Sequence, residues 1–190
     1  FNKMLNVVNT EEAPNLVVAY QNQAATYQLA DSLLDMRSLV ESEKWGLSEE
    51  DASDFFQGFF SADLFPSFDG ARLGFPPNRS MEVMYYNADW LAELGFDAPP
   101  ATPEEFKAAA CAAAETPFSG VVGESPTMGY QLSVDASRFA SWTFAFGGDV
   151  FDYDSNMYSY NNEAAVAALS FIQELFNEGC AAIVAERYGD

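Results

Sequence analysis

The chain has 190 residues, of which 49% are hydrophobic and 15% aromatic, enough for a packed core. Its net charge of −21 comes from 29 acidic and 8 basic residues, so phosphate backbones and anionic lipid repel it, which argues against nucleic-acid and membrane-surface partners. Histidine is absent, which excludes Ser-His-Asp and Cys-His catalysis and histidine-containing metal sites. No apolar run approaches the ~18 residues of a membrane span.

The two ends and the two cysteines bear on cellular location. The sequence starts at Phe1 without a signal peptide and stops soon after a predicted helix. We therefore expect both ends to be cut, with a secretory signal or a lipid-anchoring cysteine upstream. Cys111 and Cys180 fit neither a CxxC redox motif nor a zinc cluster. A disulfide between them would stabilise an exported protein by about 4 kcal/mol, and the alternative is two buried thiols on unrelated helices.

The first element is predicted from a continuous apolar run, Leu16–Tyr20, which is typical of a buried parallel strand. Gln21, Asn22 and Gln23 follow at once, and a helix is predicted from about Ala24 to Leu34. In open α/β sheets ligands bind at the carboxyl ends of strands. The amides either contact a ligand or cap the helix; we favour the ligand, because three amides exceed what one cap needs.

The next helix is predicted to begin at Ser48, with acidic residues in its first turn. Its phenylalanines follow the spacing i, i+1, i+4, i+5, which indicates a core face rather than an aromatic binding platform; they are Phe55, Phe56, Phe59 and Phe60. A turn over Phe68–Arg72 separates two extended pieces. Further strands are predicted at Leu73–Phe75 and at Met81–Tyr86, the second largely apolar on both faces.

The rest of the chain alternates strands and helices, which predicts an α/β fold. Helices are expected over Ala88–Leu94, from the Thr102 cap to about Glu115, over Ala136–Phe146 after the Asp135 cap, and over Glu163–Glu178. The spacing of apolar residues in the last helix predicts a buried stripe of Ala165, Leu169, Ile172, Leu175 and Phe176. Extended segments are expected at Gly120–Gly123, at Gly129–Val134, and in a hairpin of Val150–Phe151 with Met157–Tyr160.

The hairpin turn also imitates a calcium-binding EF-hand loop, from Asp152 to Glu163. The position that requires glycine for the turn of such a loop holds Met157. A hairpin turn followed by a capped helix explains the same residues, so no metal is assigned. The triplet Asn78-Arg79-Ser80 is a glycosylation sequon, a pattern that is common by chance.

Four motifs in order resemble one family. The stretch VMYYNADWLAELGFDAPPATPEEF (residues 83–106) is similar to a signature of extracellular solute-binding proteins of ABC importers, family 1, the maltose-binding-protein-like group. Residues 14–40, the hairpin DGARLGFPPNRS (residues 69–80) and residues 141–179 with their Gly-Gly pair resemble three other blocks of that family. The likeness extends over nearly the whole chain, and such proteins are usually about twice as long. The chain therefore resembles a central portion of such a protein.

The resemblance implies a periplasmic-binding-protein type II-like fold, incomplete at both ends, with two lobes joined by crossing hinge strands. Residues 1–83 would belong to lobe one and 84–190 to lobe two, with the hinge crossover at about 84–87. Hinge bending would close the cleft on the ligand. The implied ligand-binding residues are Gln21, Asn22, Gln23, Tyr27, Asn78, Arg79, Ser80, Asp135, Ser137, Arg138, Trp142, Gly147 and Gly148.

These residue types suit a polar solute. Amides and arginines offer directional hydrogen bonds to hydroxyls or carboxylates. Tyr20, Tyr27 and Trp142 are candidates to stack on a sugar face. Sugar binders of the family often carry Trp and Asp on the first loop, where this chain has Tyr20 and amides. Arg79 and Arg138 contact either the ligand or surface acids.

The resemblance implies an exported protein that binds a polar small solute, a sugar or oligosaccharide, and delivers it to an ABC permease. We expect a periplasmic or extracellular, membrane-anchored monomer without catalysis or cofactor. One alternative is a binder of glycerol phosphate, a glycerophosphodiester or another anionic solute. The other is a carboxylate-based glycan hydrolase, for which no acid pair has a favourable spacing.

Overall fold

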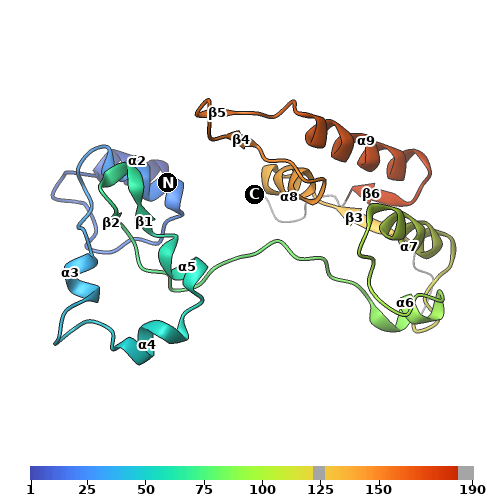
Figure 1. The fold of residues 1–190 in the computed structure, drawn as a ribbon, viewed down its shortest axis with the longest axis horizontal. Helices are drawn as coiled ribbons and strands as arrows, with labels where there is room; N and C mark the ends of the chain where they lie inside the picture. The colour runs from blue at the N-terminus through green and yellow to red at the C-terminus, as the bar shows by residue number, and fades with distance from the viewer. Residues whose placement is uncertain (122–126, 184–190) are drawn as a thin grey trace. The chain divides into compact units, whose positions relative to one another are not determined.

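The computed structural model describes residues 1–121 and 127–183. The chain divides into two compact units, Phe1–Ser80 and Met81–Asp190, hereafter unit 1 and unit 2, whose elements are labelled in Figure 1. The predicted boundary between residues 83 and 84 and the hinge at 84–87 remain predictions. Within the described ranges, no helix has the length and apolarity that crossing a membrane requires.

Unit 1 consists of short helices and one two-stranded hairpin (Figure 1). The elements are α1 (Asn2–Val7), α2 (Gln21–Gln28), α3 (Arg37–Val40), α4 (Glu49–Asp54), α5 (Gln57–Ser61), β1 (Leu64–Phe65), the 3-10 helix η1 (Pro66–Phe68) and β2 (Ala71–Arg72). Strands β1 and β2 are antiparallel, and Leu64 pairs with Arg72. The predicted turn is confirmed: Asp69 and Gly70 both have positive φ, 52° and 69°, which lets the chain reverse there.

Polar side chains take part in the core of unit 1. Arg72 is 4% exposed, donates from Nη1 to the carbonyl oxygen of Phe60 at 2.8 Å, and lies 4.3 Å above the Phe60 ring. Its backbone N–H donates to the Asp35 carboxylate at 3.1 Å. These contacts connect the hairpin to two earlier segments of the unit and satisfy a buried charge.

The predicted strand at Leu16–Tyr20 is wrong. The segment has no regular structure, and Leu16 and Val18 are 87% and 89% exposed. A strand needs a neighbour that accepts its N–H groups and donates to its carbonyls, and among the described residues this segment has none. Helix α2 then runs from Gln21 to Gln28 rather than from Ala24 to Leu34, and Asp31 beyond it has a positive φ of 50°.

The single phenylalanine-bearing helix is wrong as well. The Ser48 cap is confirmed, because its Oγ accepts from the Asp51 N–H at 3.1 Å. However, α4 ends at Asp54, and Phe55 and Phe56 are extended. The Gln57 amide donates to the carbonyls of Ala52 and Phe55 at 3.0 and 3.2 Å, which satisfies the end of α4 and favours the break.

Unit 2 alternates helices with short strands (Figure 1). The elements are α6 (Ala88–Glu93), α7 (Pro103–Glu115), β3 (Tyr130–Leu132), α8 (Ala136–Ala145), β4 (Phe151–Asp152), β5 (Met157–Tyr158), α9 (Glu163–Asn177) and β6 (Ala181–Ile183). Strands β3 and β6 are parallel, and β4 and β5 form the predicted hairpin. The caps predicted at Thr102 and Asp135 are confirmed by hydrogen bonds to backbone N–H groups, and Asn162 caps α9 in the same way.

The core of unit 2 lies between α7, α9 and the β3–β6 pair. Ala110, Leu175 and Cys180 are buried there, and Phe106 and Phe171 pack against them. Cys111 and Cys180 are joined by a disulfide. A Cβ on Gly129 would lie 2.0 Å from the Ala110 carbonyl oxygen, so only glycine fits where α7 approaches β3.

An exposed ion-pair network also connects α7 and α9. The Lys107 ammonium donates to Glu174 and Glu178 at 2.6 and 2.7 Å. Hydrogen bonds with these two carboxylates raise the pKa of Lys107, and the bond to Lys107 lowers the pKa of Glu174.

Two predictions in unit 2 differ from the structure. The strand expected at Met81–Tyr86 is irregular and exposed throughout. Leu169, assigned to the buried stripe of α9, is 50% exposed, because α8 and β6 cover the opposite side with Ala165, Ala168 and Leu175. Strand β6 was not predicted. The last two residues of the extended segment expected at Gly120–Gly123 lie outside the described residues.

Candidate functional site

In unit 1 the structure brings together two segments that the sequence predicted to bind ligand. Arg79 lies beside Gln21 at the N-terminus of α2, and the Gln21 amide oxygen, turned toward the guanidinium, accepts from Nη1 and Nη2 at 3.2 and 3.3 Å. Arg79 also forms an ion pair with Asp63, and the two side chains are only 17% and 9% exposed. The guanidinium is thus held between α2 and the residues before the β-hairpin.

The other candidates in unit 1 have different surroundings. Gln23 caps α2, because its Oε1 accepts from the Tyr20 N–H at 3.1 Å. Tyr27 is 2% exposed and packs against the Phe1 ring, so its ring is not open to a solute. Asn22, Asn78 and Ser80 are exposed.

In unit 2 five side chains form a polar cluster at the N-terminus of α8. Glu82 pairs with Arg138, whose Nε donates to Ser133 Oγ at 3.1 Å, and Glu82 Oε1 lies 2.9 Å from Ser137 Oγ. Asp135 caps the helix: its carboxylate accepts from the Ser137 hydroxyl, and from the Ser137 N–H at 2.6 Å. These two hydrogen bonds are the main reason why the pKa of Asp135 is lowered.

The last three candidates of unit 2 have structural environments. The Trp142 ring packs among Phe106, Phe146 and Phe171, and its Nε1 donates to Tyr130 Oη at 3.2 Å. Gly147 ends α8 with φ 81°. A Cβ on Gly148 would lie 2.4 Å from the Ala164 Cβ, so this glycine lets the chain pass close to α9.

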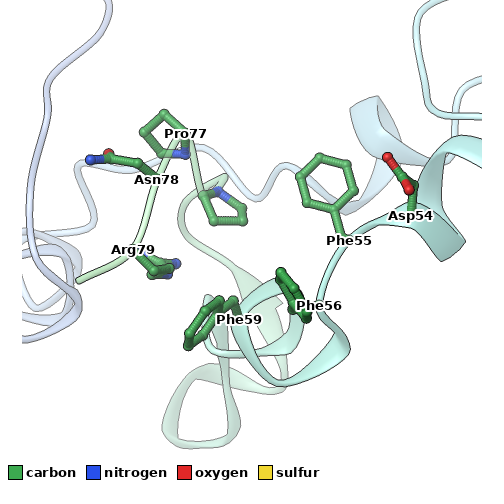
Figure 2. A pocket seen from close by; sticks show the side chains of 8 residues that line it. Asp54, Phe55, Phe56, Phe59, Pro77, Asn78 and Arg79 are labelled. Carbon is green, nitrogen blue, oxygen red and sulfur yellow. The ribbon is translucent and has the colours of Figure 1, made fainter. Parts of the chain in front are cut away.

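A pocket of about 370 Å³ opens in unit 1 next to Arg79 (Figure 2). It is lined by Asp54, Phe55, Phe56, Phe59, Pro76, Pro77, Asn78 and Arg79. Figure 2 shows the phenyl rings on one side and the segment of Pro77 and Arg79 on the other, with Arg79 extending toward the rings. The amide of Asn78 points away from the rings.

Several residues of these sites were missed by the sequence analysis. Phe56 is 81% exposed and lines the pocket with Phe59, although both were assigned to the core. Asp63 and Glu82 were not singled out, because their arginine partners lie 16 and 56 positions away and no local pattern announces such a pair. Phe56 is exposed because the helix breaks between α4 and α5. The residue that could have indicated this break is Gln57, whose side-chain amide donates to the carbonyls of Ala52 and Phe55.

Potential metal ligands group at one place in the described part of the chain, where Cys111, Glu178 and Cys180 lie within 4.8 Å of one another. Both sulfurs are bonded to each other, so they offer no thiolate. In the loop that imitates an EF-hand, Asp152 accepts from the Asp154 N–H at 2.9 Å and from Ser155 Oγ at 2.6 Å, which stabilises the hairpin turn.

Comparison with known proteins identifies the class. The family described as bacterial extracellular solute-binding protein matches residues 1–181, so the chain belongs to that family. Among solved structures, the ABC substrate-binding protein Lmo0181 from Listeria monocytogenes, in complex with cycloalternan, is similar with a TM-score of 0.62 and 20% sequence identity. The likeness covers 95% of this chain and 44% of that chain, so this chain spans less than half the length of that protein. A comparison with curated proteins gave no match.

These findings confirm the family resemblance and the fold class drawn from the four sequence motifs. At 20% identity the structural likeness shows the fold alone. The roles of the individual ligand-binding candidates remain predictions.

Proposed function

We propose that this chain forms part of an extracytoplasmic receptor that binds a neutral polar solute, a sugar or an oligosaccharide, and delivers it to the permease of an ABC importer. The observation that carries the proposal is the family match over residues 1–181. The Listeria protein of the same fold binds cycloalternan, an oligosaccharide, which supports a carbohydrate. The receptor acts as a monomer whose lobes close by a hinge at about residues 84–87.

The pairing of the two arginines favours a neutral solute over an anion. Arg79 pairs with Asp63, and Arg138 pairs with Glu82, each within its own unit. An anionic solute would have to compete with these carboxylates, and the net charge of −21 repels it at long range. The hydroxyl groups of a neutral solute need no counter-charge, and they can form hydrogen bonds with donors and acceptors of the protein that the two ion pairs leave free. The glycerol phosphate alternative therefore has less support than the sugar.

The surroundings of the acids favour binding over hydrolysis. A glycosidase needs two carboxyl groups free to act on one bond. Asp63 and Glu82 hold arginines, and Asp135 caps α8. Each of these three carboxylates thus has a structural partner, which supports a receptor without a catalytic step.

The test is a solute panel that contains neutral oligosaccharides, cycloalternan among them, and glycerol phosphate. A ligand at about 100 times its Kd stabilises the folded state by about 2.7 kcal/mol, which raises Tm by several degrees. We expect a rise with at least one neutral oligosaccharide, confirmed by calorimetry, and no cleavage products. A rise with glycerol phosphate alone, or the appearance of cleavage products, would contradict the proposal.

A further inference from the structure

The pocket beside Arg79 has a wall of aromatic rings that the fold does not need for its core. Phe55 packs edge-on against Phe75, with ring centroids 5.6 Å apart, and also contacts Phe60. Phe56 and Phe59 project from this cluster and are 81% and 38% exposed. Their rings lie 6.1 Å apart at 72°, so they form two walls that meet nearly at a right angle.

The opposite wall combines prolines with a charged group. Pro76 is buried and Pro77 exposed, and both keep the backbone on a fixed path past the rings. Arg79 extends toward the rings (Figure 2). Its charge is balanced by the ion pair with Asp63. Its Nε–H is buried without a hydrogen-bond partner among the described residues. Asp54 adds an exposed carboxylate at the rim.

This combination suits one chemical class. A purely apolar ligand would cover Arg79 and Asp54 without giving them hydrogen bonds, which costs free energy. An anion would compete with Asp63 for the guanidinium. A pyranose ring satisfies both walls, because its C–H face is apolar and its rim carries hydroxyls. The volume of about 370 Å³ is at the lower end of small-molecule sites, about 300 to 1,000 Å³, which suits a small number of rings.

We propose that this pocket is a carbohydrate subsite that receives one sugar ring, with its C–H face on Phe56, one edge against Phe59 and its hydroxyls toward Arg79 and Asp54. The inference rests on the proposed function, keeps the candidate Arg79, and adds Phe56, Phe59 and Asp54, which are not among the thirteen candidate residues. Phe56 and Phe59 then select for a ring with an apolar face, and open-chain polyols are excluded.

The first experiment measures binding of maltotriose, cellotriose and sorbitol by calorimetry. We expect wild type to bind a glucose trimer and not sorbitol, which has hydroxyls but no ring face. Phe56→Ala and Phe59→Ala each weaken trimer binding about tenfold, the loss of one aromatic contact. The matched control is Trp45→Ala, which removes a 75% exposed aromatic ring outside the pocket and leaves binding unchanged.

A second pair of variants tests whether binding requires the flat aromatic ring of Phe56 or only an apolar side chain of similar size. Phe56→Leu keeps an apolar side chain and is expected to bind the trimer about as weakly as Phe56→Ala. Phe56→Trp keeps an aromatic ring and is expected to bind the trimer about as well as wild type. Because Phe56 is exposed, none of these changes disturbs packing, and thermal unfolding checks this. Saturation-transfer NMR on wild type is expected to show the strongest transfer at C–H protons of one face of a sugar ring.

The outcomes distinguish the two proposals. If wild type binds neither a trimer nor any oligosaccharide of the panel, the proposed function fails and the subsite fails with it. If wild type binds a trimer and the Phe56 and Phe59 variants bind equally well, only the subsite is overturned. Equal binding by Phe56→Leu and wild type would also overturn it, because bulk rather than an aromatic face would then suffice.

Discussion

At the scale of single residues, the ion pair of Arg79 and Asp63 fixes the position of the Arg79 guanidinium in unit 1. The two side chains are 17% and 9% exposed, so both charges have lost most of their hydration. Such a pair adds little over an apolar pair of the same shape, but it is costly to break, because removal of one partner strands the other charge. The position of Arg79 next to Gln21 and the aromatic wall therefore depends on Asp63.

The first prediction concerns Asp63→Asn, which leaves the Arg79 guanidinium without a counter-charge. We expect the free energy of unfolding to fall by about 3 kcal/mol, the loss typical of a broken buried pair. Urea denaturation followed by circular dichroism measures it. Glu174→Gln is the control, because Glu174 pairs with Lys107 in an exposed pair and the effect should be smaller. Equal losses in the two variants would contradict the burial argument.

The second prediction concerns acid stability. Hydrogen bonds from the Arg37 side chain and backbone lower the pKa of Asp35 from 3.8 to about 2. A carboxyl whose pKa is lower in the folded state stabilises the fold above its unfolded pKa, and this contribution disappears as the pH falls from 3.8 through about 2. Asp35→Asn should thus lose less stability on acidification than wild type.

The measurement is the urea midpoint of both proteins at about pH 6 and about pH 2. The difference between wild type and Asp35→Asn is expected to shrink at the lower pH. Using this difference removes the general effect of acid on a chain of net charge −21, because both proteins share that effect. A difference that stays constant over this range would refute the role of Asp35.

At the scale of elements, the end of α8 places two adjacent glycines under different constraints. Gly147 has φ 81° and open space around a Cβ, so it is needed for its backbone conformation. Gly148 has an ordinary φ, but a Cβ there would meet Ala164 at 2.4 Å and Thr143 Cγ2 at 3.3 Å. One glycine thus ends the helix, and the other lets the chain pass close to α9.

The third prediction uses this contrast. Gly147→Ala should cost about 1 kcal/mol for the left-handed conformation, and Gly148→Ala about 2 kcal/mol for overpacking. Asparagine tolerates left-handed backbone, so Gly147→Asn should recover part of the loss, whereas Gly148→Asn should be worse than Gly148→Ala. Thermal unfolding of the four variants checks the order. Recovery by asparagine at both positions would contradict the packing argument.

The fourth prediction concerns the disulfide that connects α7 to the residue before β6. Cys111 and Cys180 are 69 positions apart, so the bond closes a long loop in unit 2. The double change Cys111→Ala and Cys180→Ala should lower the free energy of unfolding by about 4 kcal/mol. Dithiothreitol should destabilise wild type by a similar amount and leave the double variant unaffected. Sensitivity of the double variant to the reductant would contradict this assignment.

At the scale of the whole molecule, the charge of −21 sets the long-range field in which a solute arrives. Both candidate arginines are paired within their own units, so this field is not offset by a free cationic site at Arg79 or Arg138. A neutral solute does not feel the field at long range, and an anion is slowed by it. The charge distribution thus favours the neutral solute of the proposed function.

The fifth prediction follows from the proposal that the solute carries no net charge. Between about 20 mM and about 500 mM salt the Debye length falls from about 20 Å to about 4 Å, so interactions between separated charges are screened at the higher concentration. The Kd for a neutral oligosaccharide is expected to change by less than about twofold over this range. Calorimetry at both salt concentrations measures it. A large change with salt would indicate a charged solute and favour the anionic alternative.

Much of the helical structure could be predicted, because its signals are local. Thr102 with Pro103, Asp135 before α8, and Asn162 before α9 each cap a helix through a residue two or three positions away. The hairpin of β4 and β5 has a similarly short range. The family could be predicted too, since four motifs in the order of the family extend over nearly the whole chain, and the family match over residues 1–181 confirms it.

The candidate site was predictable only in part. Gln21 and Arg79 were both proposed as ligand contacts, and the structure places them together. Tyr27 and Trp142 were proposed as stacking residues, yet both pack within their units, because an aromatic side chain at helical spacing serves a core equally well. Phe56 and Phe59 were missed for the opposite reason: their exposure depends on the helix break at Phe55.

The sequence by itself determined the helix caps, the turn residues, the absence of histidine chemistry and the family, because each depends on residue identity over a short range or on motif order. Only the tertiary structure decided which extended segments are strands. Leu16–Tyr20 has strong β-propensity and no strand partner within residues 1–121 and 127–183, whereas Ala181–Ile183 has little local signal and pairs with Tyr130–Leu132. Tertiary structure also decided which acid faces Arg79 and which rings line the pocket. Strand pairing and burial are properties of two segments at once, so neither segment alone encodes them.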